Sequence, residues 1–171
     1  LIDPENAISF SYGAFTIKEK NIGLLLTFDD GLSDQYIAAK ILAKYGIKAI
    51  FFIPTCILKD ELPANPIIIH YCIAKFGLFT FLNELNKILE KHVENFQNYL
   101  IQFTQGKDDP NNIINKIKKL FKYDLDPKLS RIILLEIYEH MFHGKYSNAM
   151  EIMHLTKNQV SEMLEMGHSI G

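Results

Sequence analysis

Residues 21–54 read NIGLLLTFDDGLSDQYIAAKILAKYGIKAIFFIP and carry the strongest structural signal in the chain. The stretch opens with a continuous apolar run over residues 21–28 and closes with a second run over residues 47–53. Neither run alternates between apolar and polar positions, a pattern typical of strands buried on both faces of a parallel sheet. Between them, apolar residues recur at helical spacing after Ser33, a candidate N-cap, and Gly46 stands where the helix should end. We therefore predict a strand–helix–strand unit with a right-handed crossover.

Helix signals replace strand signals after this unit. Asp109 and Asp126 are each followed by proline, the combination expected at an N-cap and the first helical position. Thr156 and Gln159 have the spacing of a capping box, which predicts a further helix near the end of the sequence. We therefore expect three segments: the first strands and helix of an α/β domain over residues 1–55, an all-helical insertion over residues 56–150, and a return to the α/β domain over residues 151–171.

The composition fits one globular domain, or one domain that carries a large insertion. The 171 residues have a net charge of -2, and 48% of them are hydrophobic. A nucleic-acid partner is not expected, because the chain has no basic excess and Arg131 is its single arginine. No transmembrane segment is expected, because the most apolar stretch, residues 67–82, is short for a ~30 Å hydrocarbon core. Cys56 and Cys72 show no metal-binding spacing and are predicted to be reduced, structural thiols.

The candidate active site is the sequence Asp29-Asp30-Gly31, which follows directly after the first apolar run. Ligands of parallel α/β sheets bind beyond the carboxyl ends of the strands, so the two acids stand at an active-site position. Adjacent carboxylates repel each other unless a cation offsets them, which favours a metal ion held by one acid and proton transfer by the other. Gly31 permits the tight turn that this arrangement requires. The alternative is that both aspartates are solvated turn residues before a helix.

Three stretches resemble one known family. The sequence TFDDG at residues 27–31, followed by KAIFFIPT at residues 48–55, resembles the first motif and second strand of the polysaccharide deacetylases, the NodB-homology carbohydrate esterases. The sequence LTKNQVSEMLEMGHSIG at residues 155–171 is similar to the helix and strand start that precede the second motif of that family. The resemblance implies an α/β fold, a partial (β/α) barrel of the polysaccharide deacetylase type with an all-helical insertion.

The resemblance also implies roles for the two acids. Asp29 would be the catalytic general base and Asp30 a metal ligand, with two further histidine ligands expected beyond Gly171. The cofactor would be a divalent metal ion, with zinc expected, since such an ion lowers the pKa of bound water to about 7 and polarises a carbonyl. The implied function is metal-dependent hydrolysis that removes N-acetyl groups from a sugar or polysaccharide. Because the sequence opens with Leu1 and Ile2 and without Met, we expect the chain to be an excerpt of a longer polypeptide. Because the later motifs of the family do not occur here, we expect it to be incomplete for catalysis.

Within the deacetylase hypothesis, the bond that is hydrolysed could be an O-acetyl ester instead of an N-acetyl amide. Two other classes of protein also remain open. One is a catalytically inactive relative that binds glycans or partner proteins through the helical insertion. The other is a Mg²⁺-binding phospho-acceptor domain, in which an acid pair at the end of the first strand lies beside a separate acceptor aspartate.

Further candidate groups occur in the expected insertion. Glu136, His140 and His143 fall at i, i+4 and i+7, so they share one helical face and have a spacing that can hold a metal ion. Because the helix has a high aliphatic content, we expect His140 and His143 to face solvent or to be satisfied within the core, and not to bind a metal ion. Clustered phenylalanines are interpreted as packing residues that could alternatively line a sugar site. These phenylalanines are Phe76, Phe79 and Phe81.

Overall fold

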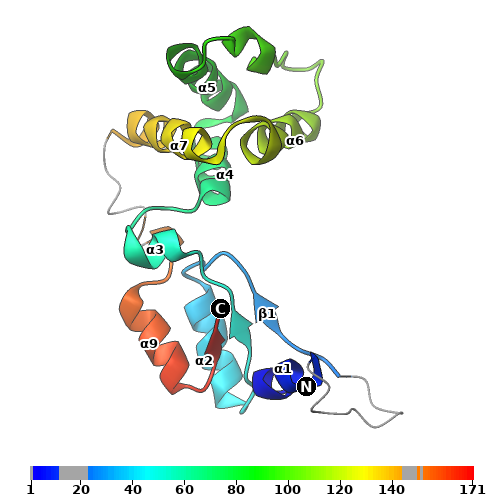
Figure 1. Cartoon of the computed structure of the whole chain (residues 1–171), viewed down its shortest axis with the longest axis vertical. Helices are drawn as coiled ribbons and strands as arrows, with labels where there is room; N and C mark the ends of the chain where they lie inside the picture. Colours follow the sequence, from blue (N-terminus) through cyan, green and yellow to red (C-terminus); the bar gives the residue numbers. More distant parts are fainter. Residues whose placement is uncertain (1, 12–22, 144–149, 151) are drawn as a thin grey trace. The chain divides into compact units, whose positions relative to one another are not determined.

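The computed structural model describes residues 2–11, 23–143, 150 and 152–171, and they belong to two compact units. We call the first the sheet unit, Leu1–Ala64 together with Ser147–Gly171, and the second the helical unit, Asn65–Tyr146. Figure 1 shows the elements of each unit coloured along the sequence.

The sheet unit is built on three short parallel strands in the order β1-β2-β3, namely β1 (Thr27–Phe28), β2 (Ile50–Phe51) and β3 (Ser169–Ile170). The central strand β2 pairs Ile50 with Thr27 on one side and with Ser169 on the other. Helix α2 (Gln35–Lys44) connects β1 to β2, so the predicted strand–helix–strand unit is confirmed. The ladder hydrogen bonds are confined to a few residues, and the strands are therefore shorter than the apolar runs that predicted them.

Helices cover the sheet and complete its core. Helix α9 (Lys157–Glu165) lies beside α2, and the Tyr36 hydroxyl donates a hydrogen bond to the Glu162 carboxylate between them (Figure 1). Phe51 is fully buried in the central strand and stacks on Phe28 with 4.7 Å between ring centroids. Two shorter helices, α1 (Pro4–Ser11) and α3 (Thr55–Lys59), belong to the same unit. A sheet with this few strands is stable because helices bury its apolar residues.

The expected (β/α) barrel is wrong for the part of the chain that the structure describes. The described residues are 63% helical, and their small three-stranded sheet remains open, with β1 and β3 at the edges. A closed parallel barrel of this kind needs about eight strands. Between β2 and β3 the described residues form helices, loops and one isolated bridge at His154, and they add no further strand to the sheet.

The helical unit contains four main helices, which are α4 (Asn65–Phe76), α5 (Leu78–His92), α6 (Pro110–Lys119) and α7 (Pro127–Phe142). Two short segments join them, the 3-10 turn Phe96–Tyr99 and the π-helical turn Leu120–Asp124. Both α4 and α5 pack against α7. The ring of Phe142 in α7 contacts Tyr71, with 5.1 Å between centroids, and Tyr138, with 4.6 Å between centroids. Buried aliphatic and aromatic side chains thus give this unit a core of its own.

The predicted starts of α6, α7 and α9 are confirmed, because each capping side chain binds backbone groups of its own helix. The Asp109 carboxylate accepts a hydrogen bond from the backbone of Asn111 at the start of α6, and Asp126 does the same for α7. Thr156 and Gln159 form the complete capping box of α9. Each cap satisfies backbone N–H groups that have no partner within the first helical turn.

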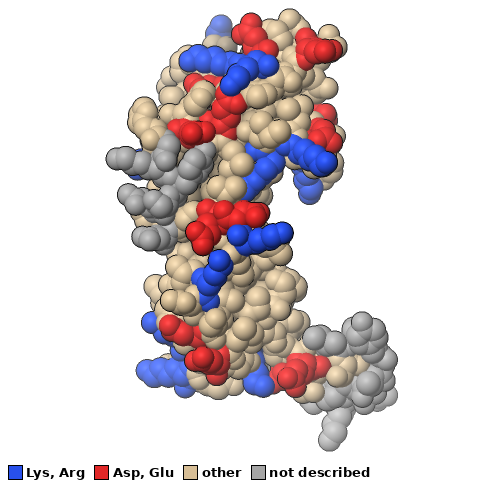
Figure 2. Space-filling view, turned by 60° about the vertical axis from the view of Figure 1, so that its left-hand side comes forward, with Lys and Arg blue, Asp and Glu red and all other residues tan. Residues whose placement is uncertain are grey.

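The surface carries charges of both signs, in line with the net charge of -2. Acidic and basic side chains are interspersed over the face shown in Figure 2. None of the helices within the described ranges combines the length and apolarity needed to cross a membrane.

Cys56 and Cys72 are both free thiols; Cys72 is buried in α4, whereas Cys56 is partly exposed. Burial raises the pKa of the Cys72 thiol to about 12.

We predict that iodoacetamide modifies Cys56 much faster than Cys72 in the folded protein at about pH 8, because the thiolate is the reactive form and burial disfavours it at Cys72. Peptide mass mapping over a time course measures both rates. In denaturant the two rates should converge, and a Cys56→Ser variant should lack the fast reaction. Equal rates in the folded protein would contradict the prediction.

Candidate functional site

The two candidate acids lie in a sharp turn at the carboxyl end of β1. We call residues 29–31 the acidic turn. Asp29 and Asp30 are both exposed, whereas Gly31 is buried. Asp30 has a φ of 73° and Gly31 a φ of 59°, so two consecutive residues have left-handed backbone conformation. Aspartate accepts this conformation more readily than most residues, and glycine adopts it without a steric penalty.

Gly31 lies directly against the core of the sheet unit. A Cβ atom at this position would be 2.9 Å from Cγ2 of Ile53 and 3.2 Å from Cδ1 of Ile57. Both isoleucines belong to the hydrophobic cluster around Phe51. The turn therefore requires a glycine for two reasons, its positive φ and the absence of space for a side chain.

Buried side chains bind the carbonyl groups of the acidic turn. The side-chain nitrogen Nε2 of Gln35, in the first turn of α2, donates to the Asp29 carbonyl at 2.5 Å. The backbone N–H of Leu155 donates to the Gly31 carbonyl at 3.0 Å, and Nδ1 of His154 lies 3.2 Å from the same oxygen. Gln35 is 7% exposed and His154 is 1% exposed. The backbone of the turn is thus bound on both sides of Asp30, while both carboxylates remain at the surface.

Residues 152–155, which we call the clamp segment, lie beside Leu32 and Ser33, just before α2 begins. The clamp segment forms an antiparallel bridge between His154 and Leu32. The Ser33 N–H donates to the Met153 carbonyl at 3.0 Å, and the Ser33 hydroxyl donates to the Ile152 carbonyl at 2.6 Å. The predicted N-cap role of Ser33 is therefore wrong, because its hydroxyl is used by the clamp segment.

Burial favours the neutral form of the His154 imidazole. Burial lowers its pKa, although the Gly31 carbonyl and the negative charge of Asp30 act in the opposite direction. A carbonyl oxygen can only accept a hydrogen bond, so the neutral imidazole carries its proton on Nδ1, which faces Gly31.

The expectation of a divalent metal cofactor, zinc, is wrong for the chain as described. Among the residues with defined positions, no group of three or more His, Cys, Asp or Glu side chains could hold a metal ion. A zinc site needs at least three protein ligands that converge on one point. His168, the histidine nearest to the end of the sequence, is buried between Ala39 and Ala49, where both of its ring nitrogens have backbone partners. The two histidines expected beyond Gly171 lie outside this sequence.

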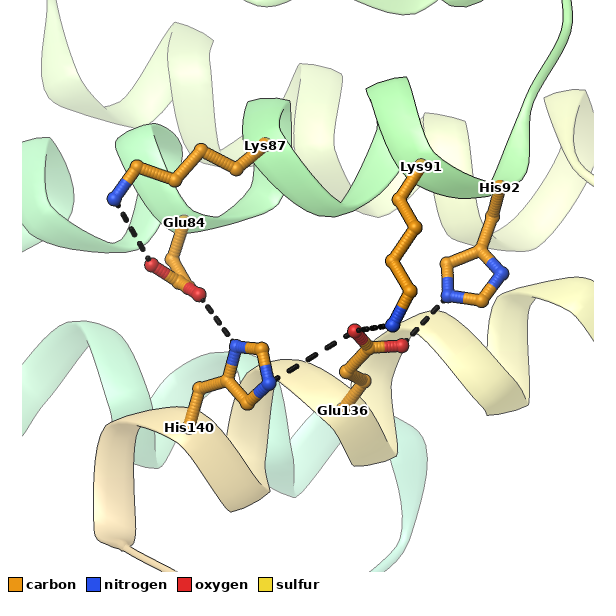
Figure 3. Close-up of polar contacts among 6 residues, drawn as sticks. All are labelled: Glu84, Lys87, Lys91, His92, Glu136 and His140. Carbon is orange, nitrogen blue, oxygen red and sulfur yellow. Dashed lines mark hydrogen bonds and ion pairs between the residues drawn. The ribbon is translucent and has the colours of Figure 1, made fainter.

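The second candidate group is part of a polar network between α5 and α7, shown in Figure 3. Glu136 contacts Nζ of Lys91 at 2.7 Å and Nε2 of His92 at 2.6 Å. His140 contacts Glu84 at 2.8 Å through Nδ1. We call the six drawn residues the α5–α7 network: Glu84, Lys87, Lys91, His92, Glu136 and His140. Glu136 and His140 therefore cross-link two helices and are engaged by these partners.

His143, the third member of the expected helical face, is the C-cap of α7 and has a φ of 54°. It is exposed and takes no part in the contacts drawn in Figure 3. The structure thus brings together two of the three residues that share this spacing, in a structural role.

The phospho-acceptor alternative expects an acceptor aspartate at the end of a neighbouring strand. The strand β2 runs into Phe52, Ile53 and Pro54. No acid therefore follows β2, the strand that pairs with β1.

Comparisons with protein-family models, with curated proteins and with solved structures gave no match. The chemistry of the acidic turn must therefore be judged from its own residues.

Gln35 and His154 are the two site residues that sequence reasoning missed. The position of His154 between Met153 and Leu155 is a weak signal of burial, and Gln35 carries no such signal.

We predict that Gly31→Ala lowers the free energy of unfolding by about 2–4 kcal/mol, because left-handed strain and overpacking against Ile53 add together. The matched control is Gly46→Ala, since Gly46 has a similar φ of 66° but no atom within 4 Å of an added Cβ. This control should cost only about 1 kcal/mol. Urea denaturation followed by circular dichroism measures both. Equal losses would show that the contact with Ile53 is unimportant.

We predict that Glu136→Gln destabilises the protein by about 0.5–1.5 kcal/mol at neutral pH. The hydrogen bonds from Lys91 and then His92 lower the pKa of Glu136. Its stabilising effect is therefore complete above its unfolded value of 4.5 and is lost as the pH falls through the lowered folded value.

The measurement is the unfolding free energy of wild type and variant at pH 7 and at about pH 3, where the difference should shrink. Glu139→Gln is the matched control, because Glu139 lies on the same helix and is exposed. A difference that is independent of pH, or an equal loss in the control, would contradict the assignment.

Proposed function

We propose that this protein takes part in hydrolytic deacetylation of carbohydrates, releasing acetate from N-acetylated sugars, with the acidic turn as its reactive element. The observation that carries the proposal is a pair of exposed, adjacent carboxylates on a backbone bound by buried side chains at the carboxyl end of a parallel strand. The resemblance of residues 27–31 and 48–55 to the polysaccharide deacetylases supports the choice of reaction and substrate.

Asp29 is assigned as the general base. In amide hydrolysis, a water molecule loses a proton to the base while its oxygen bonds to the carbonyl carbon of the acetyl group. The carbon–nitrogen bond then breaks, the amine leaves with a proton, and acetate is released. An exposed carboxylate that can receive a proton from water suits the first of these steps, and Asp29 is exposed next to the strand end.

The fixed backbone of the turn supports a catalytic rather than a merely solvated role. Surface turns made of acidic residues seldom need buried polar side chains to hold their carbonyl groups, because water satisfies these groups. Here Gln35 and His154, both buried, are used for this purpose. Fixing the backbone that carries the reactive carboxylate reduces the entropy lost when substrate and base meet.

The test is acetate release from N-acetylated chito-oligosaccharides by the full-length protein. Asp29→Asn should lower kcat by about 10²–10⁴-fold, the usual contribution of a general base, with little change in KM. Asp34→Asn is the matched control, since Asp34 is also exposed and its side chain makes no capping hydrogen bond. The control should retain activity within about twofold of wild type.

Two results would overturn the proposal. One is the absence of acetate release from the N-acetylated oligosaccharide by folded protein, and the other is an Asp29→Asn variant as active as the control. An O-acetylated glycan is tested in parallel, and release from this substrate alone would reassign the reaction to ester hydrolysis.

A second candidate, glycan binding without turnover, is favoured by one observation in the helical unit. Phe79 is 58% exposed and lines a cavity of about 640 Å³ together with Phe76 and Phe103. Sugar rings stack on exposed aromatic faces. Phe81, by contrast, is fully buried and packs in the core. Calorimetric titration with the same oligosaccharides distinguishes the candidates, because Phe79→Ala would abolish binding in this second case while Asp29→Asn would leave it intact.

A further inference from the structure

We propose that His154 is the positioning residue of the acidic turn, and that its Nδ1–H fixes the Gly31 carbonyl and thereby the placement of Asp29. The effect on catalysis rests on the function proposed above, whereas the effect on the turn does not.

The first argument is the backbone conformation that His154 secures. Asp30 and Gly31 are consecutive left-handed residues, and a backbone with two such residues in a row is stabilised by hydrogen bonds to its carbonyl groups. The Gly31 carbonyl has two partners, the Leu155 N–H at 3.0 Å and Nδ1 of His154 at 3.2 Å. Of these, the His154 imidazole is the partner supplied by a side chain, so it is the one that a substitution can remove.

The second argument is the state of the other ring nitrogen. His154 is 1% exposed, and its Nε2 is buried without a hydrogen-bond partner among the described residues. An aliphatic side chain of similar size would avoid this unpaired nitrogen. The only hydrogen bond that the imidazole makes to the described residues is therefore the one from Nδ1–H to the Gly31 carbonyl of the acidic turn.

The third argument is the comparison with His168, the other buried histidine of the sheet unit. Nδ1 of His168 accepts a hydrogen bond from the Ala49 N–H at 3.2 Å, and its Nε2 lies 3.0 Å from the Ala39 carbonyl. Both of its nitrogens are engaged within the core, away from residues 29–31. His168 is thus an equally buried histidine with a purely structural role, and it provides a matched control.

The experiment compares His154→Leu, His154→Asn and His168→Asn in the full-length protein. The asparagine amide nitrogen occupies about the place of Nδ1 and can donate to the Gly31 carbonyl, whereas leucine cannot donate at all. The first readout is amide hydrogen exchange of residues 31–33 and 153–155, resolved by NMR. The second readout is kcat and KM for acetate release.

His154→Leu should raise exchange at these amides by about tenfold or more, because the turn opens more often. It should lower kcat by about 10–100-fold with KM changed less than about twofold, because the base is displaced but the substrate site is not. His154→Asn should restore most of both properties. His168→Asn should lower the melting temperature without changing exchange at the turn or kcat.

Unchanged exchange at residues 31–33 in His154→Leu would overturn the proposal, and so would a His154→Asn variant as impaired as the leucine variant. If His154→Leu does not fold, the asparagine variant decides alone: wild-type exchange and kcat support the proposal, and losses in both overturn it. If wild type releases no acetate, the proposed function fails, but the exchange measurements still test whether His154 positions the turn.

Discussion

The contact between Gly31 and the side chains of Ile53 and Ile57 is the constraint on which the acidic turn depends. Because glycine lacks a Cβ, the backbone can lie directly on the aliphatic core and adopt a left-handed conformation at little cost. Carbonyl groups drawn toward the core in this way need partners, and Gln35 and His154 provide them. The packing that stabilises the sheet unit therefore also determines where the charges of Asp29 and Asp30 stand.

The features that could be predicted from the sequence are those set by neighbours along the chain. Asp109 and Asp126 cap helices through backbone groups two or three residues away, so their patterns can be read directly. The strand–helix–strand unit is similarly local, and Gly46 has the expected left-handed conformation at the end of α2. Ser33 marks the limit of such reasoning, since its hydroxyl bonds to Ile152, a partner that no nearby pattern reveals.

The barrel and the zinc site failed as predictions because both depend on elements that converge from distant parts of the chain. A motif such as TFDDG reports the end of one strand, whereas the number of strands around it depends on the rest of the sequence, which here forms helices. A metal site likewise needs several donors at one point, and the described residues do not supply them. Gln35 and His154 were missed for a different reason: their partners are backbone carbonyl groups, which no pattern of side chains in the sequence reveals.

The hydrogen bond between Gly31 and His154 joins residues that lie 123 positions apart in the sequence. Closing so long a loop in a flexible chain costs conformational entropy. The helical unit has a core of its own between the two residues, so its prior folding would replace most of that flexible loop by a compact body. A folded helical unit would thereby lower the entropy cost of bringing the clamp segment to the acidic turn.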